Sequence, residues 1–419
     1  MILINKQIKS FFNKKILYIL SFAIACTTST SVKSNPLDYK IWVAAESHES
    51  FPNANYISNY GIRSAGFQAK KDINKNISSQ IAINILSNNK IAIDESFLEV
   101  KNGNALFGFG KINRNWSFSP NTSLILSKNA RPAESIYFAL GKKNKPSDQL
   151  ILRKIPWSFE IFNSSLSTSQ KIKNPMMLGM RAVIEPVHNL KFEFIKTSQW
   201  GGDQQNNNSS SLFAALLGNT NDSKHSDINQ LAGFGLSFLS KVEKIPLRFY
   251  AQFVGEDEAG SLPSCYMSLV GSEMEFQEKK LFSKIGLEFI DTRIDTSSHG
   301  YCGPNTAYNN GKYSYDNHGR VLGDKIDTEG KSINLWATVK ISEITSINYS
   351  IMNVTINDAN WNNHRLSSSK TDGWLANIEA LWKINDINIR GNINYQNFSL
   401  DTAGFKEGIS LKINTEYIF

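Results

Sequence analysis

Apolar and polar residues alternate along much of the chain with a period of two. Near the C-terminus, Ile409, Leu411 and Ile413 alternate with Lys412 and Asn414. Successive side chains of a strand point to opposite faces, so such a run predicts a strand with one apolar face. Segments of about ten residues with an apolar outside and a polar inside are typical of transmembrane β-barrels. The same alternation recurs at 81–85, 190–194, 333–341 and 374–382.

The segments and the connections between them form a regular series. Long and short connections alternate along the chain, so that all long connections fall at one end of the predicted strands and all short turns at the other. The long connections are 113–134, 199–229, 256–265, 294–332 and 357–372. We therefore expect one smooth, periplasmic rim and one rim that carries long loops. The predicted fold is an all-β, closed, antiparallel transmembrane barrel of about 18 strands. The predicted strands are 39–46, 62–70, 78–87, 91–100, 104–112, 135–142, 155–163, 176–185, 190–198, 230–240, 245–255, 266–277, 283–293, 333–341, 344–356, 373–383, 387–398 and 408–419.

Composition agrees with a barrel and excludes other classes. Of the 419 residues, 41% are hydrophobic and the mean hydropathy is −0.30, which excludes a bundle of membrane helices. Three cysteines exclude a disulfide-dense scaffold. A barrel accommodates polar residues because its inward face meets water while its backbone groups pair between strands. Trp374 and Trp382, near the two ends of one segment, suit the aromatic girdles of such a barrel.

The first 34 residues resemble a secretory signal peptide. Lysines from Lys6 to Lys15 precede an apolar run from Ile16 to Ala25, and a Ser/Thr stretch follows. We therefore expect residues 1–34 to be a signal peptide and residues 35–419 to form the barrel in the outer membrane. Five lysines and no acidic residue precede Asn35, so the formal charge falls from +8 to +3 without them. The basic balance is thus mostly a property of the leader, and we expect no nucleic-acid partner.

Aromatic and charged residues on the predicted loops are candidates for carbohydrate contacts. An aromatic face can stack on a sugar ring, arginine can bind acidic sugars, and carboxylates can accept hydrogen bonds from hydroxyls. Each residue type also has a structural explanation. A tryptophan can lie at the membrane interface, and an arginine can pair with acids of the barrel wall. The acidic residues can belong to a solvated loop or pair with arginines. The acidic run matches no EF-hand spacing, and we predict neither a metal site nor a cofactor. The candidates are Arg114, Trp116, Arg131, Trp200, Asp203, Glu256, Asp257 and Glu258.

Two cysteines fall on the same predicted rim. Cys265 and Cys302 lie at the loop-bearing ends of neighbouring strands. Because an exported chain meets an oxidising environment, we predict a disulfide that restrains the 294–332 loop. Two free thiols are the alternative, and alkylation without a reductant would detect them by mass.

Taken together, a series of ordered motifs resembles the Wzi family of outer-membrane capsule-assembly lectins. The resemblance covers about residues 39–419 and implies an eighteen-stranded barrel that binds capsular polysaccharide, holds it at the cell surface and catalyses no reaction. It also implies outer-membrane lipid and, as a further partner, a polysaccharide export complex. We expect the family's N-terminal helical plug to be absent before Tyr39, and the segment after Trp116 departs from the family pattern. The motifs are QWGGD at 199–203, NQLAGF at 229–234, GEDEAGxLP at 255–263, DTR at 291–293, LGD at 322–324 and NARP at 129–132.

Other functions remain open at this level. A porin-like diffusion channel is the main alternative to a lectin, and an exported soluble all-β protein is a more distant one. The chain contains no Gly-x-Ser-x-Gly elbow, phosphate-binding loop or His-Glu-x-x-His motif. An outer-membrane lipase, whose Ser and His need only be close in space, is not excluded by sequence. We therefore expect a non-enzymatic polysaccharide-binding barrel.

Overall fold

The computed structural model describes residues 37–51, 61–142, 155–168, 172–218, 228–242, 245–259, 262–278, 281–294 and 303–419. The predicted signal peptide, residues 1–34, lies outside these ranges. Within them, no helix is long and apolar enough to cross a membrane.

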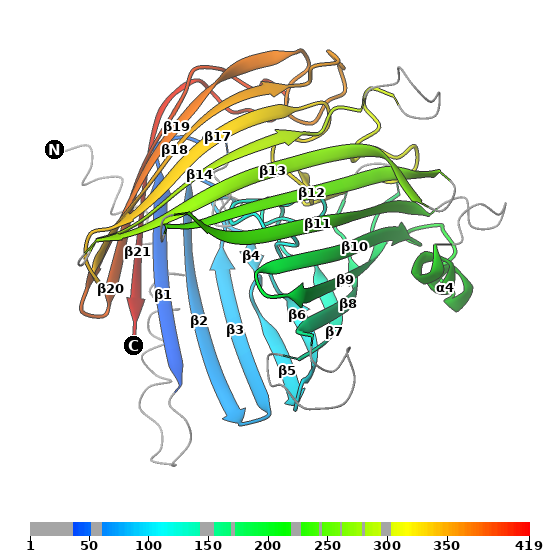
Figure 1. The fold of residues 1–419 in the computed structure, drawn as a ribbon, viewed down its shortest axis with the longest axis horizontal. Coiled ribbons are helices and arrows are strands. Elements are labelled where there is room, and N and C mark those ends of the chain that lie inside the picture. Colours follow the sequence, from blue (N-terminus) through cyan, green and yellow to red (C-terminus); the bar gives the residue numbers. More distant parts are fainter. Residues whose placement is uncertain are drawn as a thin grey trace.

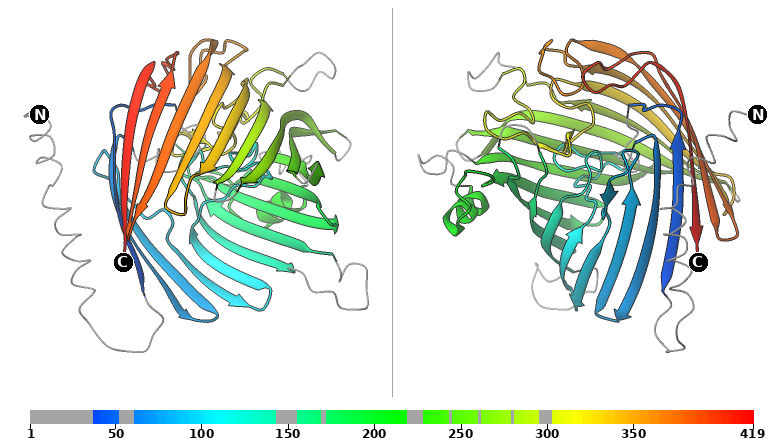
Figure 2. Two further views of the ribbon diagram at one scale, coloured as in Figure 1. Left: turned by 60° about the vertical axis from the view of Figure 1, so that its left-hand side comes forward. Right: turned by 180° about the vertical axis from the view of Figure 1, so that it is seen from behind.

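The chain forms one closed antiparallel barrel (Figures 1 and 2). Each strand pairs with the next along the chain, and β1 closes the ring by pairing with both β2 and β21. The strands are β1 Asp38–Glu46, β2 Arg63–Asn74, β3 Ile77–Ile85, β4 Ile91–Ala92, β5 Phe97–Asn102, β6 Ala105–Lys111, β7 Glu134–Lys142, β8 Trp157–Ser165, β9 Met176–Val187, β10 Leu190–Trp200, β11 Asn229–Val242, β12 Ile245–Ala259, β13 Leu262–Glu278, β14 Leu281–Asp291, β17 Lys331–Lys340, β18 Thr345–Ile356, β19 Thr371–Ile384, β20 Ile387–Gln396 and β21 Gly408–Ile418.

One strand of the barrel is interrupted. Both β4 and β5 pair with β3, at its two ends, and residues 93–96 bulge between them. Glu95 adopts a left-handed backbone conformation there, with φ of 72°. Because β4 and β5 form a single interrupted strand, the nineteen segments of the sheet make eighteen barrel strands. The predicted fold and strand number are confirmed.

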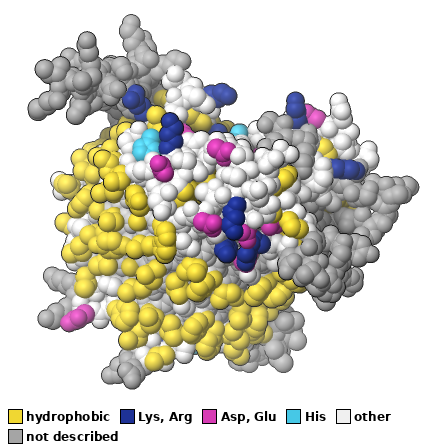
Figure 3. All heavy atoms as spheres, turned by 90° about the horizontal axis from the view of Figure 1, so that it is seen from above, with side chains coloured by type: hydrophobic (Ala, Val, Ile, Leu, Met, Phe, Trp, Pro, Cys, Tyr) yellow, Lys and Arg dark blue, Asp and Glu magenta, His cyan; other side chains and the backbone are white. Residues whose placement is uncertain are grey.

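The outward face is apolar, as the alternation predicts. Ile333 and Leu335 on β17, and Trp374 and Trp382 on β19, are between 43% and 51% exposed to the outside. In Figure 3, hydrophobic side chains cover a broad, continuous area of the outer face, and charged side chains gather beside it. Because lipid offers no hydrogen bonds, this apolar belt on a fully paired sheet marks a membrane-spanning barrel.

On the inward face, aromatic rings lie over glycines of neighbouring strands. A Cβ atom added to Gly108 would lie 2.2 Å from the ring of Tyr137, and one added to Gly179 would lie 2.3 Å from Phe162. Tyr250 covers Gly271 in the same way. Glycine leaves room for the ring to lie flat on the strand, and the ring shields the exposed backbone. These pairs give the wall a smooth inner surface on which folded loops pack.

The two rims differ, with two corrections to the prediction. The turn rim, for which the sequence predicts only short turns, has connections as short as two residues, such as 75–76 between β2 and β3. The first correction is that residues 143–156 form a long connection between β7 and β8 on this rim. The loop rim carries the long connections, but the predicted loop 256–265 is wrong. There β12 and β13 continue as a paired ribbon to Ala259 and Leu262. Acidic residues, glycine and proline resemble a loop in sequence, yet backbone pairing extends through them.

Candidate functional site

A loop from the loop rim folds into the lumen and is buried there. This first inward loop, residues 112–133, joins β6 to β7. Gln252 of β12 holds it with both ends of its amide, since Nε2 donates to the carbonyl of Trp116 at 2.6 Å and Oε1 accepts from the Leu124 amide at 2.8 Å. Glu288 of β14 accepts hydrogen bonds from Ser119 and from Asn121, the latter at 2.5 Å. Wall side chains thus satisfy loop groups that would otherwise be buried without partners.

A second loop lies against the first. This second inward loop, residues 303–330, contains a small hairpin of β15 (Asp316–Asn317) and β16 (Arg320–Val321). Tyr308 Oη donates to the Leu124 carbonyl at 2.5 Å, and Tyr315 Oη donates to the Ile125 carbonyl at 2.7 Å. The two tyrosine rings stack at 5.7 Å. Rings and backbone together join the two inward loops into one buried core.

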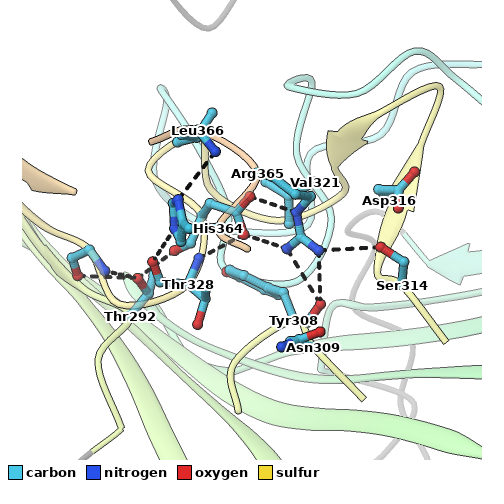
Figure 4. Close-up of polar contacts among 12 residues, drawn as sticks. Thr292, Tyr308, Asn309, Ser314, Asp316, Val321, Thr328, His364, Arg365 and Leu366 are labelled. Carbon is cyan, nitrogen blue, oxygen red and sulfur yellow. Dashed lines mark hydrogen bonds and ion pairs between the residues drawn. The ribbon is translucent and has the colours of Figure 1, made fainter. Parts of the chain in front are cut away.

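Arg365, on the connection between β18 and β19, ties the second inward loop to a third segment (Figure 4). Its Nε donates to Asp327 at 2.7 Å and its Nη1 donates to Ser314 Oγ at 3.2 Å. Burial alone would raise the pKa of the Asp327 carboxyl, but Arg365 beside it lowers that pKa overall. The neighbouring His364 is fully buried, with Nε2 at 3.0 Å from the Thr328 carbonyl. A buried ion pair of this kind fixes the position of the loops it joins.

Three of the predicted sugar contacts lie inside this core. Arg114 donates to Glu160 of β8 at 2.7 Å, and its guanidinium lies 4.2 Å from the ring centre of Phe162. Arg131 makes two hydrogen bonds to Asp94, at 2.7 and 3.1 Å. Trp116 is 2% exposed and packs edge-to-face on Phe162. The two arginines therefore pair with acids of the barrel wall, and Trp116 has no free face for a sugar ring.

Trp200 and Asp203 lie together at the loop rim but differ in exposure. Trp200 is 6% exposed, donates from Nε1 to Asn163 at 3.2 Å and packs against helix α4, Ser209–Leu217. The helix is capped by Asn208 at its N-terminus and by Gly218 at its C-terminus. Asp203 is exposed, and Asn174 lies 3.3 Å from its carboxylate. Asp203 is thus available to a ligand from outside, whereas Trp200 stabilises the helix.

The three consecutive acids continue along β12. The Glu256 carboxylate is buried and accepts from the Tyr308 amide at 3.3 Å, so it faces the second inward loop. The backbones of Asp257 and Glu258 pair with Ser264 and Pro263 of β13, while their side chains lie outside the described set. The run therefore forms part of a ribbon and not a loop.

Cys265 is disulfide-bonded and adopts a positive φ of 58° in β13. Cys302 lies outside the described residues, so the Cys265–Cys302 pairing stays a prediction.

Sequence reasoning missed a cavity in the lumen. This lumen chamber, of about 540 Å³, extends along β17 to β21 and ends against the two inward loops. Its walls carry many asparagines, and both inward loops contribute a lysine. Only the recurrence of Asn at inward positions of consecutive strands hinted at it, and that pattern is ordinary for a water-facing wall. The principal polar residues of the chamber are Asn121, Lys128, Lys284, Lys325, Asn334, Trp336, Asn348, Asn377, Glu379, Arg390, Asn392, Asn394, Lys412 and Asn414.

The described residues contain no group of three or more His, Cys, Asp or Glu side chains that could hold a metal ion.

Comparison with solved structures supports the fold. Wzi from Escherichia coli, described as an outer-membrane, carbohydrate-binding β-barrel involved in group 1 capsule assembly, matches 91% of this chain and 84% of its own, with a TM-score of 0.76 and 20% identity. The Pseudomonas aeruginosa barrel OccK5 matches 91% of this chain and 96% of its own, with a TM-score of 0.51 and 8% identity. At these identities the likenesses concern the fold.

Sequence comparison assigns the family. A curated protein of Klebsiella pneumoniae, described as an uncharacterized 55.8 kDa protein in the cps region, is 29% identical over 200 residues. The match covers 47% of this chain and 40% of that relative, so less than half of either is aligned. The family model described as capsule assembly protein Wzi matches residues 44–406. With that match over most of the barrel, the chain belongs to the Wzi capsule assembly family.

Proposed function

We propose that this protein is a non-enzymatic lectin of the outer membrane that binds capsular or related exopolysaccharide and anchors it at the cell surface. The observation that carries the proposal is the family match over residues 44–406. The similarity to a carbohydrate-binding barrel and the closed barrel with its apolar belt support it. Many weak contacts along one polymer would produce firm retention through avidity.

Contacts from outside would involve the loop rim. Asp203 has an exposed carboxylate there, and Asp257 and Glu258 belong to the β12–β13 ribbon on the same rim. Carboxylates accept hydrogen bonds from sugar hydroxyls. The buried Arg114, Trp116, Arg131, Trp200 and Glu256 would act indirectly, by holding the loops in place.

Loss of the gene tests the proposal on cells. We expect polysaccharide to move from the cell-bound fraction to the medium, and to return when the intact gene is supplied. A companion measurement is binding of the purified protein to polysaccharide from the same cells. Polysaccharide that stays cell-bound without the gene would contradict the anchoring role.

A passive diffusion channel is the second candidate, and the lumen chamber is the observation that favours it. The two inward loops, buried in the lumen, oppose it. Recordings in planar bilayers separate the two functions, because a channel gives steady, large conductance that polysaccharide does not change.

A polysaccharide export complex is a further proposed partner. It would deliver the polymer to the lectin, and crosslinking in intact cells followed by mass spectrometry tests whether the two lie close together.

A further inference from the structure

The lumen chamber contains buried polar groups that lack partners. Asn334, Trp336 and Asn414 line it, and each side chain is 7% exposed. Asn334 Oδ1, Trp336 Nε1 and Asn414 Oδ1 make no hydrogen bond with any described residue. Because buried donors and acceptors are destabilising unless something satisfies them, these groups indicate that the chamber holds a polar occupant.

The charges in the chamber are of two kinds. On the wall, Arg390 lies 3.7 Å from Glu379 and Lys412 lies 3.6 Å from Glu46, so these cations have carboxylate partners. On the inward loops, Lys128 and Lys325 line the chamber without a direct ion pair to a described carboxylate, although Glu95 attracts Lys128 and both Asp324 and Glu288 attract Lys325 from a longer distance. The Lys325 ammonium lies 5.6 Å from the ring centre of Phe51. The inward loops thus place two ammonium groups at the chamber that lack the direct carboxylate contact of the wall cations.

Amides and lysines without a direct ion pair line the same chamber and favour a particular ligand chemistry. Asparagine offers both a donor and an acceptor, which suits hydroxyl groups that need both. A lysine ammonium forms stronger, charge-assisted hydrogen bonds with carboxylate or phosphate. Water would satisfy the amides but would not supply the direct anionic partner that the two lysines lack. A volume of about 540 Å³ lies within the range of small-molecule sites.

From this combination we infer that the lumen chamber is a binding site for a short acidic oligosaccharide. Its carboxylate or phosphate lies near Lys128 and Lys325, and its hydroxyls hydrogen-bond the asparagines of β17 and β21. The inference rests on the proposed lectin function and deepens it, since it places recognition of the acidic group inside the barrel and not on the outer loops. A polymer end, or a fragment of it, is the form of glycan that such a chamber accommodates.

Calorimetric titration of the full-length protein in detergent tests the site with two matched probes. Cellobiouronic acid and cellobiose differ in one carboxylate. We expect the acid to bind at least about tenfold more tightly, as one charge-assisted hydrogen bond predicts. Inorganic phosphate is the third probe, and it should bind more weakly than the acidic disaccharide because it lacks the sugar hydroxyls.

Variants locate the binding within the barrel. The double variant Lys128→Gln with Lys325→Gln should lose about tenfold or more in affinity for cellobiouronic acid and little for cellobiose. Trp336→Phe keeps the ring over Gly286 but removes the unpaired N–H, and should weaken binding a few-fold. Lys331→Gln is the control, since Lys331 is exposed on the outer side of β17, and it should bind like the unaltered protein. Heat-modifiable migration on a gel confirms that each variant forms the barrel.

Several results would overturn the site. They are no binding of cellobiouronic acid, equal binding of the acid and cellobiose, phosphate binding as tight as the acid, or unchanged affinity in the double lysine variant. If the unaltered protein still binds whole polysaccharide in any of these cases, the chamber inference fails while the lectin function stands. If it binds neither the polysaccharide nor the probes, the lectin function itself fails.

Discussion

Between β5 and β13 the inward side chains meet folded loops, whereas between β17 and β21 they face the lumen chamber. The wall has the same geometry on both sides. On the packed side, wall polar groups such as Gln252 have loop partners at 2.6 to 2.8 Å. On the hollow side, buried groups such as Asn414 Oδ1 lack protein partners. Whether protein fills a part of the lumen therefore depends on which loops fold inward and hydrogen-bond the wall there, and not on how polar the wall is.

Replacing one arginine of an ion pair on each side should give the largest difference in stability between the packed and the hollow side. Arg365→Leu leaves Asp327, 2% exposed, without its partner, and we expect a loss of about 3–5 kcal/mol in the free energy of unfolding. Arg390→Leu in the chamber should cost less than about 1 kcal/mol, because that pair is longer and more solvated. Denaturant titration in lipid vesicles measures both. Equal losses would contradict the division into a packed and a hollow side.

Adding one methyl group to a glycine tests the packing of the wall. In Gly179→Ala the new Cβ would lie 2.3 Å from the Phe162 ring, and we expect a loss of about 1–3 kcal/mol in stability. Gly391→Ala, on the outward face of β20, is the control, since the nearest neighbour of its Cβ would be Trp382 at 3.6 Å, an ordinary contact. The same titration compares them, and a harmless Gly179→Ala would show that the ring moves aside freely.

Single polar atoms give a finer test. Tyr308→Phe removes the hydroxyl that donates to the Leu124 carbonyl and should cost about 1–2 kcal/mol in the free energy of unfolding. Trp336→Phe removes an N–H that has no protein partner, and we expect it to be nearly neutral in the absence of ligand. Unfolding curves of both variants check this difference. A large loss for Trp336→Phe would mean that its N–H is already satisfied.

A pH change near neutrality should act weakly, through buried histidines of the packed side. Burial lowers the pKa of His364, whose Nδ1 accepts from the Leu366 amide at 3.2 Å, so the folded chain keeps it neutral. As pH falls below the ordinary value of 6.5, the unfolded chain takes up the proton first and stability declines. From His364 alone we expect a loss of about 1 kcal/mol or less between about pH 7.5 and pH 6, so the pH dependence should be smaller in His364→Gln. A slope remains in the variant because burial also lowers the pKa of His318, to about 4. Unfolding curves at several pH values test this, and an equal slope in the variant would contradict it.

The strands could be predicted from sequence because their signal is local. The predicted segment 408–419 corresponds to β21 at Gly408–Ile418, and the alternation there requires no knowledge of the partner strand. The β12–β13 ribbon escaped prediction because its pairing overrides turn-forming residues. A strand is thus predictable where its own alternation indicates it, and is missed where only pairing with a neighbouring strand keeps it extended.

The interior could not be predicted, because its contacts join distant parts of the chain. Asn121 and Glu288 are 167 residues apart, and Arg131 finds Asp94 on a strand interruption that no periodicity reveals. Arginine beside tryptophan suggests a sugar site in sequence, yet burial turns the same residues into anchors for the loops. Lys128 and Lys325 carry no local signal at all, and only the folded loops bring them to one chamber.

The β12–β13 ribbon continues after β12 has left its other neighbour. Pairing between β11 and β12 ends at Gly255, so among the described strands only β13 pairs with the last residues of β12, up to Ala259. At about 3.3 Å per residue, the four residues Glu256–Ala259 extend the ribbon by roughly 13 Å. One edge of β12 is therefore open to backbone pairing over this length, which is where a further strand could be added.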